Sequence, residues 1–367
     1  MARRETLDAI QGIQGGSVSE RIAFVFPGQG SQAVGMGADI YRASPAARAV
    51  FAAADRAVGF PLSRLCFEGP DETLRETINT QPAIVATSLA LLAALQEAAQ
   101  EAAGAASSTD EGEPPLDQPL HPAYVAGHSV GEYSALAAAG ALGISDTLRL
   151  VRERGRVMHA EGTICPSGMA AVLGLDAATL DAVCAEATAR ARAELGPDET
   201  HPGAGRVVVA NDNAPGQIVI SGARRALELA MEDAKARGAR RVVPLPVSGA
   251  FHSPVMSPAA EALGRAVAAA PIRAAAVPLV ANITARPITL AADVRSELAR
   301  QIEAPVQWTR SIAWLADQGV HTFVEIGAGQ VLAGLIKRIA KDVTTLAVGT
   351  AADVAPEAAR LRERLDV

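Results

Sequence analysis

A short apolar run that leads through a glycine-flanked serine into an alanine-rich helix constrains this chain most strongly. Ala123-Tyr-Val-Ala126 has the length and composition of a buried strand, and Gly127-His-Ser-Val-Gly131 follows it without a break. In such a strand–turn–helix unit, G-x-S-x-G forms a sharp turn, and its glycines leave room for the neighbouring backbone. The feature therefore favours an α/β fold with the Ser129 hydroxyl exposed at the edge of a sheet.

Other apolar runs extend this alternation of strands and helices. We expect strands over 22–26, 277–281 and 321–325, separated by helical patterns. One helix is expected from Thr80 to about Ala103, with Thr80 as its cap and Pro82 in its first turn. The alternation predicts an α/β architecture with a mostly parallel sheet.

Between residues 162 and 248 the pattern changes. Its order is strand, helix, strand, strand, helix, strand, which is typical of a small ferredoxin-like unit. These elements are expected at 169–175, 176–195, 206–210, 217–221, 224–237 and 241–247. The sequence thus predicts an α/β-hydrolase-like large domain, discontinuous over 21–161 and 249–367, with the ferredoxin-like subdomain 162–248 inserted in it. Residues 1–20 are expected to form an extension, and 104–122 and 196–205 are expected to be insertions.

Composition narrows the class of protein. The 367 residues are 49% hydrophobic and 20% charged, which indicates a sizeable core of about two domains. A net charge of −7 and only 3% aromatic residues argue against nucleic acid as a partner. Three cysteines without CxxC spacing predict neither a disulfide framework nor a zinc site. The longest apolar run, 84–95, is too short to span a membrane, and the N-terminus lacks a signal peptide's apolar core, so we expect a soluble, cytoplasmic protein.

A reactive serine needs a base, and the chain offers six histidines. His121 and His201 lie in proline-rich loops, where a solvated role is expected. His128 adjoins the serine, but neighbours in such a turn point in different directions. His252 lies in a small-residue loop after an apolar strand and follows the serine in the chain, which makes it the candidate base. The backbone N–H of Val130, at the start of the following helix, is a natural donor to an oxyanion.

Six short motifs occur in a fixed order along most of the chain. They are Phe24-Val-Phe-Pro-Gly-Gln-Gly-Ser-Gln32, Gly127-His-Ser-Val-Gly-Glu132, Arg154-Gly155, Gly249-Ala-Phe-His-Ser253, Pro305-Val-Gln-Trp-Thr309 and Val324-Glu-Ile-Gly-Ala-Gly329. Over about residues 21–345 the chain resembles the malonyl-CoA:acyl carrier protein transacylases of bacterial type II fatty acid synthesis. Single motifs are shared with acyltransferase domains of polyketide and fatty acid synthases.

The resemblance implies a role for each matching residue. Ser129 would form a malonyl ester, and His252 would activate it and later protonate the leaving thiolate. The backbone carbonyl of Gln301 would orient the histidine in place of a carboxylate. The backbone N–H groups of Gln29 and Val130 would form the oxyanion hole.

The resemblance also implies the substrate and the partners. Arg154 would bind the malonyl carboxylate, although its local sequence alone favours a surface arginine. Phe251 would leave little room for a 2-methyl group on the acyl chain. The implied partners are malonyl-CoA and holo acyl carrier protein, without a metal or redox cofactor, nucleic acid or membrane, and the expected state is a monomer. Alternatives are a malonate decarboxylase subunit, a polyketide-type acyltransferase, a serine hydrolase and an inactive scaffold that binds carrier protein.

Two weaker features leave alternatives open. Asn211-Asp-Asn213 either lines a cleft between the domains or forms an ordinary turn. The basic clusters at 224–225, 237–241 and 337–341 are solvated helix ends by default, and one of them is a candidate docking site for an acidic carrier protein.

Overall fold

The structure is a computed structural model that describes residues 20–104, 112–116, 118–196 and 199–365. The predicted extension, apart from Glu20, lies outside the described residues, as does part of each predicted insertion.

A six-stranded sheet forms the centre of the larger part of the molecule, in the order β10-β9-β1-β2-β7-β8. Its strands are β1 (Ile22–Phe26), β2 (Tyr124–Gly127), β7 (Leu279–Val280), β8 (Pro287–Ile288), β9 (Thr322–Ile326) and β10 (Thr344–Val348). Every neighbouring pair is parallel except β7 with β8, which confirms the prediction of a mostly parallel sheet. The sequence does not predict β8, which is only two residues long, or β10, a half-exposed edge strand without a buried apolar run.

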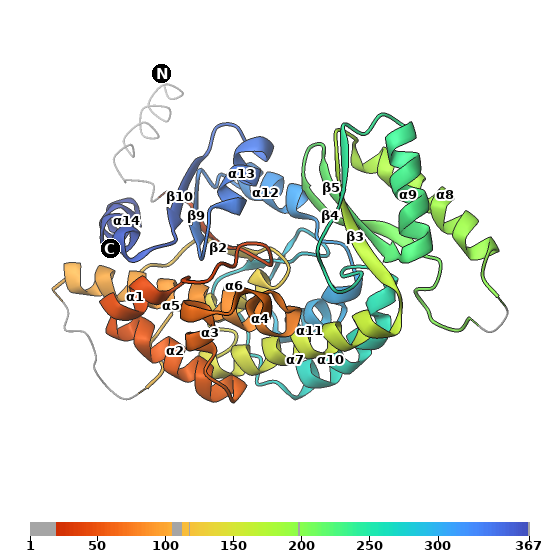
Figure 1. Cartoon of the computed structure of the whole chain (residues 1–367). Helices are drawn as coiled ribbons and strands as arrows, with labels where there is room; N and C mark the ends of the chain where they lie inside the picture. The colour runs from red at the N-terminus through yellow and green to blue at the C-terminus, as the bar shows by residue number, and fades with distance from the viewer. Residues whose placement is uncertain (1–19, 105–111, 117, 197–198, 366–367) are drawn as a thin grey trace, which may run out of the picture.

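Helices cover both faces of this sheet (Figure 1). Successive side chains of β1 point to opposite faces, so that Phe24 joins one hydrophobic cluster and Val25 another. On the Phe24 side pack α2 (Pro45–Val58), α5 (Thr77–Ala102), α7 (Ile144–Ile164), α10 (Ser257–Ala269) and α14 (Ala351–Leu365). On the Val25 side pack α12 (Trp308–Asp317) and α13 (Val331–Ile339). The remaining helices are α1 (Ala38–Ala43), α3 (Leu62–Glu68), α4 (Asp71–Arg75), α6 (Gly131–Ala138), α11 (Ala291–Arg300) and the 3-10 helices η1 (Pro254–Met256) and η2 (Gln301–Glu303).

The long helix α5 begins at Thr77, so the predicted start at Thr80 is wrong and Pro82 lies inside the helix. Proline has no N–H to donate to the carbonyl four residues earlier, which normally disrupts a helix. Here Nη1 of Arg152, on α7, donates to the carbonyl of Ile78 at 2.7 Å. The helix continues through Pro82 because a neighbouring helix satisfies the acceptor that the proline leaves unpaired.

By length and composition alone, α5 would also be able to cross a membrane. Its most apolar window, however, is 94% buried within the molecule. Its hydrophobicity is accounted for by its place between α2, α7 and α14 in the core.

A second, antiparallel sheet has the order β4-β5-β3-β6. Its elements are β3 (Ser167–Leu173), α8 (Ala177–Ala193), β4 (Val207–Ala214), β5 (Gln217–Ala223), α9 (Arg224–Ala236) and β6 (Arg241–Pro244). This order and topology confirm the predicted ferredoxin-like unit, which has a hydrophobic cluster of its own. The domain boundaries near residues 162 and 248 stay a prediction.

The two sheets are linked by β4, which continues past its predicted end at Ala210. It pairs with β5 through irregularities and also forms a parallel bridge between Asn211 and Val306. The N–H of Val306 donates to the carbonyl of Ala210 at 2.8 Å, and the N–H of Asp212 donates to the carbonyl of Val306 at 3.0 Å. Asn211 to Asn213 therefore form part of a strand and not a turn.

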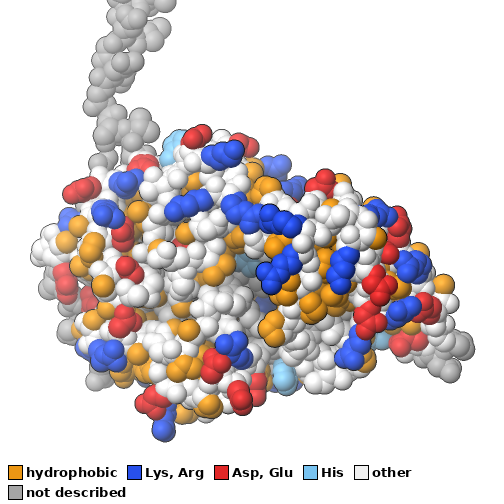
Figure 2. All heavy atoms as spheres, turned by 45° about the horizontal axis from the view of Figure 1, so that its top comes forward, with side chains coloured by type: hydrophobic (Ala, Val, Ile, Leu, Met, Phe, Trp, Pro, Cys, Tyr) orange, Lys and Arg blue, Asp and Glu red, His pale blue; other side chains and the backbone are white. Residues whose placement is uncertain are grey.

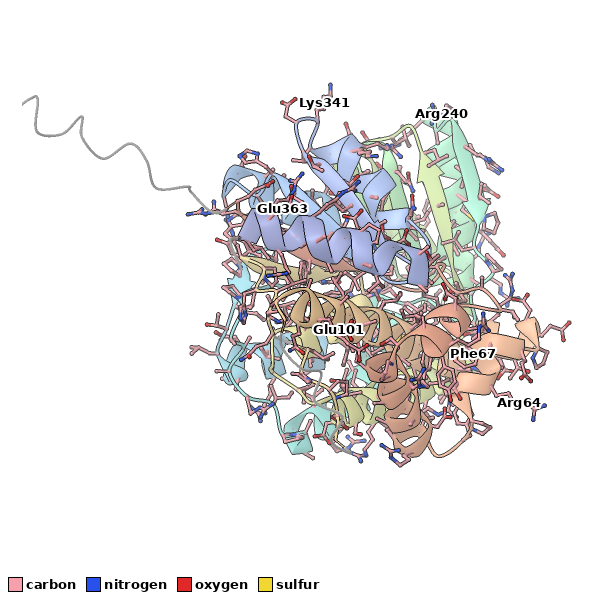
Figure 3. All side chains as sticks on the ribbon, turned by 90° about the vertical axis from the view of Figure 1, so that its left-hand side faces the viewer. Arg64, Phe67, Glu101, Arg240, Lys341 and Glu363 are labelled. Carbon is pink, nitrogen blue, oxygen red and sulfur yellow. The ribbon has the colours of Figure 1, made fainter. Side chains whose placement is uncertain are left out.

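Basic side chains gather on one face of the surface. Figure 2 shows Lys and Arg side chains along the upper rim of a hollow near the middle of that face. In Figure 3, Arg240, which precedes β6, and Lys341, which precedes β10, lie at the same end of the molecule. Two of the basic clusters in the sequence, 237–241 and 337–341, thus share one end.

Candidate active site

Ser129 occupies the turn between β2 and α6, as predicted. A Cβ added to Gly127 would lie 2.0 Å from the carbonyl carbon of Gly131, and one added to Gly131 would lie 2.2 Å from the carbonyl oxygen of Phe26. Side chains at both positions are excluded by these contacts. Ser129 has a φ of 53°, a left-handed conformation that costs a non-glycine residue free energy and is concentrated at functional sites.

Ser129 and His252 are in direct contact. The Oγ of Ser129 lies 2.7 Å from Nε2 of His252. The other ring nitrogen, Nδ1, lies 2.9 Å from the carbonyl oxygen of Gln301 and 3.1 Å from that of Ala304. A carbonyl oxygen only accepts, so Nδ1 carries the proton and Nε2 is free to accept the serine hydroxyl. The predicted contact with the Gln301 carbonyl is present, and Ala304 adds a second acceptor that the sequence does not predict.

His252 is buried and, like Ser129, has a left-handed φ, here 59°. Burial, followed by the positive charge of Arg154, lowers the pKa of His252 to about 3. Both causes disfavour the charged imidazolium. The ring is therefore neutral and able to accept a proton.

Arg154 is buried, with 1% of its surface exposed, whereas its neighbours Arg149 and Arg156 form exposed ion pairs on the same helix. Its Nη1 donates to Oε1 of Gln81 at 2.5 Å, and its Nη2 donates to Oε1 of Gln301 at 2.8 Å and to Oγ of Ser129 at 3.1 Å. Among the described residues, none of the ion pairs that the structure forms involves Arg154. A buried guanidinium held by neutral oxygens beside the serine suits a ligand that brings its own carboxylate.

The remaining predicted site residues, Gln29, Val130 and Phe251, line the same cavity as Ser129, which has a volume of about 180 Å³. A Cβ on Gly28 would lie 2.4 Å from the carbonyl oxygen of His128, so the turn that contains Gln29 packs directly against the serine turn. The structure thus brings all seven predicted residues to one place. Their roles in a reaction stay predictions.

His128 also lines this cavity, but its side chain and that of Ser129 turn to different partners, as expected for neighbours in such a turn. Its Nε2 lies 2.7 Å from Oδ1 of Asn213, and its ring packs edge-on against Trp308 at 5.5 Å. Burial lowers the pKa of His128. Asn211 and Asn213 line the cavity from β4, which decides between the two interpretations of that segment in favour of cleft lining.

Asn282 supports the serine turn and carries no signal in the sequence. Its Oδ1 accepts from the N–H of Ser129 at 2.8 Å, and its Nδ2 donates to the carbonyl of Gly127 at 2.7 Å. Glu132 in turn accepts from the N–H of Asn282 at 2.9 Å. Burial and the nearby Glu297 raise the pKa of Glu132. Glu132 ends the motif that contains Ser129, but the sequence around it does not indicate which residue it contacts.

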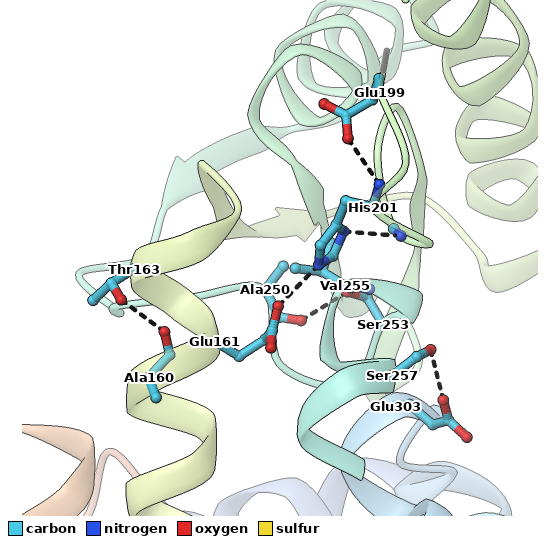
Figure 4. A network of polar contacts seen from close by, with 11 residues as sticks. Ala160, Glu161, Thr163, Glu199, His201, Ala250, Ser253, Val255, Ser257 and Glu303 are labelled. Carbon is cyan, nitrogen blue, oxygen red and sulfur yellow. Dashed lines mark hydrogen bonds and ion pairs between the residues drawn. The ribbon is translucent and has the colours of Figure 1, made fainter. Parts of the chain in front are cut away.

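The sequence predicts that His201 is a solvated loop residue, but its partly buried ring pairs with the buried Glu161 (Figure 4). Its Nε2 lies 2.9 Å from Oε1 of Glu161, and its Nδ1 accepts from the N–H of Gly203 at 3.1 Å. A Cβ on Gly203 would lie 2.4 Å from Cα of Val255. The segment 199–205 thus packs against η1, which follows the loop that carries His252.

Within the described ranges, no group of three or more His, Cys, Asp or Glu side chains is placed to hold a metal ion. The prediction that the protein uses no metal or cofactor remains untested.

Comparison with known proteins shows close relatives. Residues 23–360 match the acyl transferase domain family. The chain is 42% identical over 328 residues to the malonyl CoA-acyl carrier protein transacylase of Bacillus subtilis, an alignment that covers 89% of this chain and 93% of that protein. The acyl-carrier-protein S-malonyltransferase of Bartonella henselae is 40% identical, with a TM-score of 0.81 over 93% of this chain and 99% of that one. A malonyl-transacylase solved in complex with a type II polyketide synthase acyl carrier protein is 35% identical, with a TM-score of 0.78 over 92% of this chain and 99% of that one.

Proposed function

Since the chain belongs to the acyl transferase domain family, we propose that it transfers malonyl from malonyl-CoA to the phosphopantetheine thiol of holo acyl carrier protein for fatty acid biosynthesis. The observation that carries this proposal is the buried Arg154, whose guanidinium lies 3.1 Å from the Ser129 hydroxyl. A cation at that place pairs with the carboxylate at the far end of a malonyl group once its carbonyl meets the serine.

In the first half-reaction, Oγ of Ser129 attacks the thioester carbonyl while Nε2 of His252 takes the hydroxyl proton. The N–H groups of Gln29 and Val130 stabilise the resulting oxyanion. When the tetrahedral intermediate collapses, the C–S bond breaks and His252 gives its proton to the departing CoA thiolate. A malonyl ester remains on Ser129.

In the second half-reaction, the carrier's phosphopantetheine thiol enters the same cavity. Its proton passes to His252, its sulfur attacks the ester, and the Ser129 oxygen leaves and regains a proton from His252. The imidazolium formed in each half-reaction is oriented by the carbonyls of Gln301 and Ala304. These carbonyls replace the carboxylate of a hydrolase triad, which favours acyl transfer over the serine hydrolase alternative.

The malonyl carboxylate also assists the base. Arg154 lowers the pKa of His252 through its positive charge. A bound carboxylate offsets that charge, so the imidazolium forms more readily with malonyl than with acetyl in the site. Phe251, in the wall of the cavity, limits the space beside the acyl carbon and disfavours methylmalonyl.

The remaining features of the proposal concern partners and location. The protein works as a cytoplasmic monomer without a metal or redox cofactor, and its three cysteines, all free and buried, suit a reducing compartment. The basic end that carries Arg240 and Lys341 suits an acidic carrier. A polyketide carrier is a second candidate, because one similar structure holds a type II polyketide synthase carrier protein.

Intact-protein mass spectrometry after brief incubation with malonyl-CoA tests this proposal. We expect one malonyl adduct that disappears when holo acyl carrier protein is added and reappears on the carrier. Ser129→Ala should carry no adduct, whereas Ser134→Ala, at a buried serine of α6, should keep it. An adduct lost equally fast without carrier would identify a hydrolase, and an adduct on the Ser129→Ala variant would refute the assignment of the nucleophile.

A further inference from the structure

The side-chain amide of Gln301 connects the serine turn with Arg154. Its Nε2 donates to the carbonyl oxygen of Ser129 at 3.0 Å and also to Oε2 of Glu132. Its Oε1 accepts from Nη2 of Arg154 at 2.8 Å. Glu132, Arg154 and Gln301 are buried, and in the interior each polar atom needs a partner of the opposite kind.

The orientation of this amide follows from its partners. A carbonyl oxygen has no proton to donate, so the Ser129 side of Gln301 must be the NH₂ group. Glu132 presents a second acceptor to the same nitrogen. The amide oxygen is thereby turned toward Arg154, where it accepts from the guanidinium. The reverse orientation would place NH₂ against the guanidinium and leave donors facing donors.

Glu132 is itself held in a fixed position. It lies in the first turn of α6, fully buried, and its Oε1 accepts from the backbone N–H of Asn282 at 2.9 Å. Its two oxygens therefore have different partners, one on Asn282 and one on Gln301. No hydrogen bond in the described part of the chain joins Glu132 to Arg154 directly, so Glu132 acts on Arg154 through its charge and, geometrically, through the Gln301 amide.

We propose that Glu132 is a positioning residue for acyl-group selection, which fixes the Gln301 amide so that its oxygen holds Arg154 in place for the malonyl carboxylate. The inference rests on the proposed function, because it assigns Glu132 to the carboxylate-binding step of that reaction. Arg154 is held by two amide oxygens and no carboxylate, so its charge remains available to the substrate. Glu132 does not touch the substrate.

Glu132→Gln is the sharpest test, because it keeps the size and burial of the side chain and changes its charge and its hydrogen-bonding groups. The backbone N–H of Asn282 still requires an acceptor, so the new amide oxygen stays there. Its NH₂ group then faces Nε2 of Gln301, donor against donor. The result is that this contact breaks or that the Gln301 amide rotates by half a turn. Both outcomes disturb the amide oxygen that holds Arg154.

Glu297→Gln is the matched control. Glu297 is a second buried glutamate in this region, and its Oε1 accepts from the N–H of Ile283 at 2.9 Å. The same substitution there removes the same ionisable group but leaves an acceptor for that N–H. No hydrogen bond between Glu297 and Gln301 is found among the described residues.

The measurement is kcat/KM for transfer from malonyl-CoA and from acetyl-CoA to holo carrier protein, with wild type and both variants. Glu132→Gln should lower the malonyl-to-acetyl ratio by about tenfold or more, the factor expected for one lost hydrogen bond to a charged group. Glu297→Gln removes one cause of the raised pKa of Glu132, which favours the carboxylate that accepts from Gln301, so it should keep the wild-type ratio. Equal losses with both donors in Glu132→Gln would show a merely structural role and overturn the proposal. A wild type that does not prefer malonyl would instead overturn the proposed function.

A second variant keeps the test decisive if Glu132→Gln does not fold. Gln301→Met removes the amide but keeps the backbone carbonyl that orients His252. It should lower the malonyl-to-acetyl ratio by itself. Where Glu132→Gln does fold, the double variant should lower the ratio no further, because both changes act through one amide. A Gln301→Met variant with the wild-type ratio would overturn the proposal.

Discussion

At the residue scale, the positive charge of Arg154 acts on the base as well as on the incoming acyl group. Its Nη2 reaches the Ser129 hydroxyl, and its charge is the second cause, after burial, of the lowered pKa of His252. The charge of Arg154 therefore disfavours protonation of His252. A substrate carboxylate offsets this charge and makes His252 easier to protonate. Selectivity for such a substrate therefore comes from the base as well as from direct pairing with Arg154.

The pH dependence of acylation follows from this arrangement. A general base acts in its neutral form, and a pKa lowered to about 3 keeps His252 neutral as the pH falls. We expect kcat/KM with acetyl-CoA to show no acid limb at about 6.5, the ordinary pKa of histidine. Arg154→Gln removes one cause of the lowering, so the acid limb should move to higher pH. Single-turnover acylation from about pH 4 to 8 tests both statements, and a wild-type limb near 6.5 would contradict them.

At the scale of elements, helix α7 supplies contacts on three sides. Arg152 turns toward α5, and Arg154, two residues further, points into the cavity, since residues two apart lie on different faces of a helix. Glu161, near the C-terminal end, meets the segment 199–205. Helix α7 thus both positions Arg154, the proposed carboxylate-binding residue, and stabilises the neighbouring helix α5.

The pairing of Arg152 with the proline of α5 gives a prediction about stability. Arg152→Met should lower the free energy of unfolding by about 1–3 kcal/mol, because the carbonyl of Ile78 loses its donor. In a Pro82→Ala background the helix supplies its own N–H to that carbonyl, so the same change should cost clearly less. Urea unfolding of the four proteins measures the coupling. Equal costs in both backgrounds would show that Arg152 does not compensate for the proline.

At the scale of the whole molecule, the cavity is assembled from both sheets. The large sheet contributes the serine turn, while β4 of the small sheet contributes Asn211 and Asn213. Two of the links between these parts in the described residues are the bridge between β4 and Val306, and the segment 199–205, which packs against η1. The shape of the site therefore depends on how the two sheets are fixed to each other.

The pair of the partly buried His201 and the buried Glu161 tests the second link (Figure 4). His201→Ala leaves the Glu161 carboxylate buried without this donor and should lower the free energy of unfolding by about 2 kcal/mol. His201→Gln, which can still donate, should restore part of the loss. Arg225→Ala, in an exposed ion pair with Glu194 on the small unit, is the control and should leave the guanidinium midpoint unchanged. A His201→Ala variant as stable as wild type would show that the pair does not tie the segment down.

The sequence by itself determined those features that depend on residues close together in the chain or on a known motif. The order of strands and helices and the ferredoxin-like pattern follow from short-range periodicity, and the serine turn follows from contacts within a few residues. The resemblance of the motifs then supplied the remaining predicted residues.

Only the tertiary structure decided which distant groups meet. Ser129 and Gln301 are in contact although they are 172 positions apart. The sequence around Asn282 does not indicate that its side chain accepts a hydrogen bond from the serine turn. The start of α5 and the pairing of His201 were mispredicted because their partners, Arg152 and Glu161, come from the distant helix α7. Hydrogen bonds in the interior are chosen by which polar atoms are brought within reach, and that is a property of packing and not of sequence neighbours.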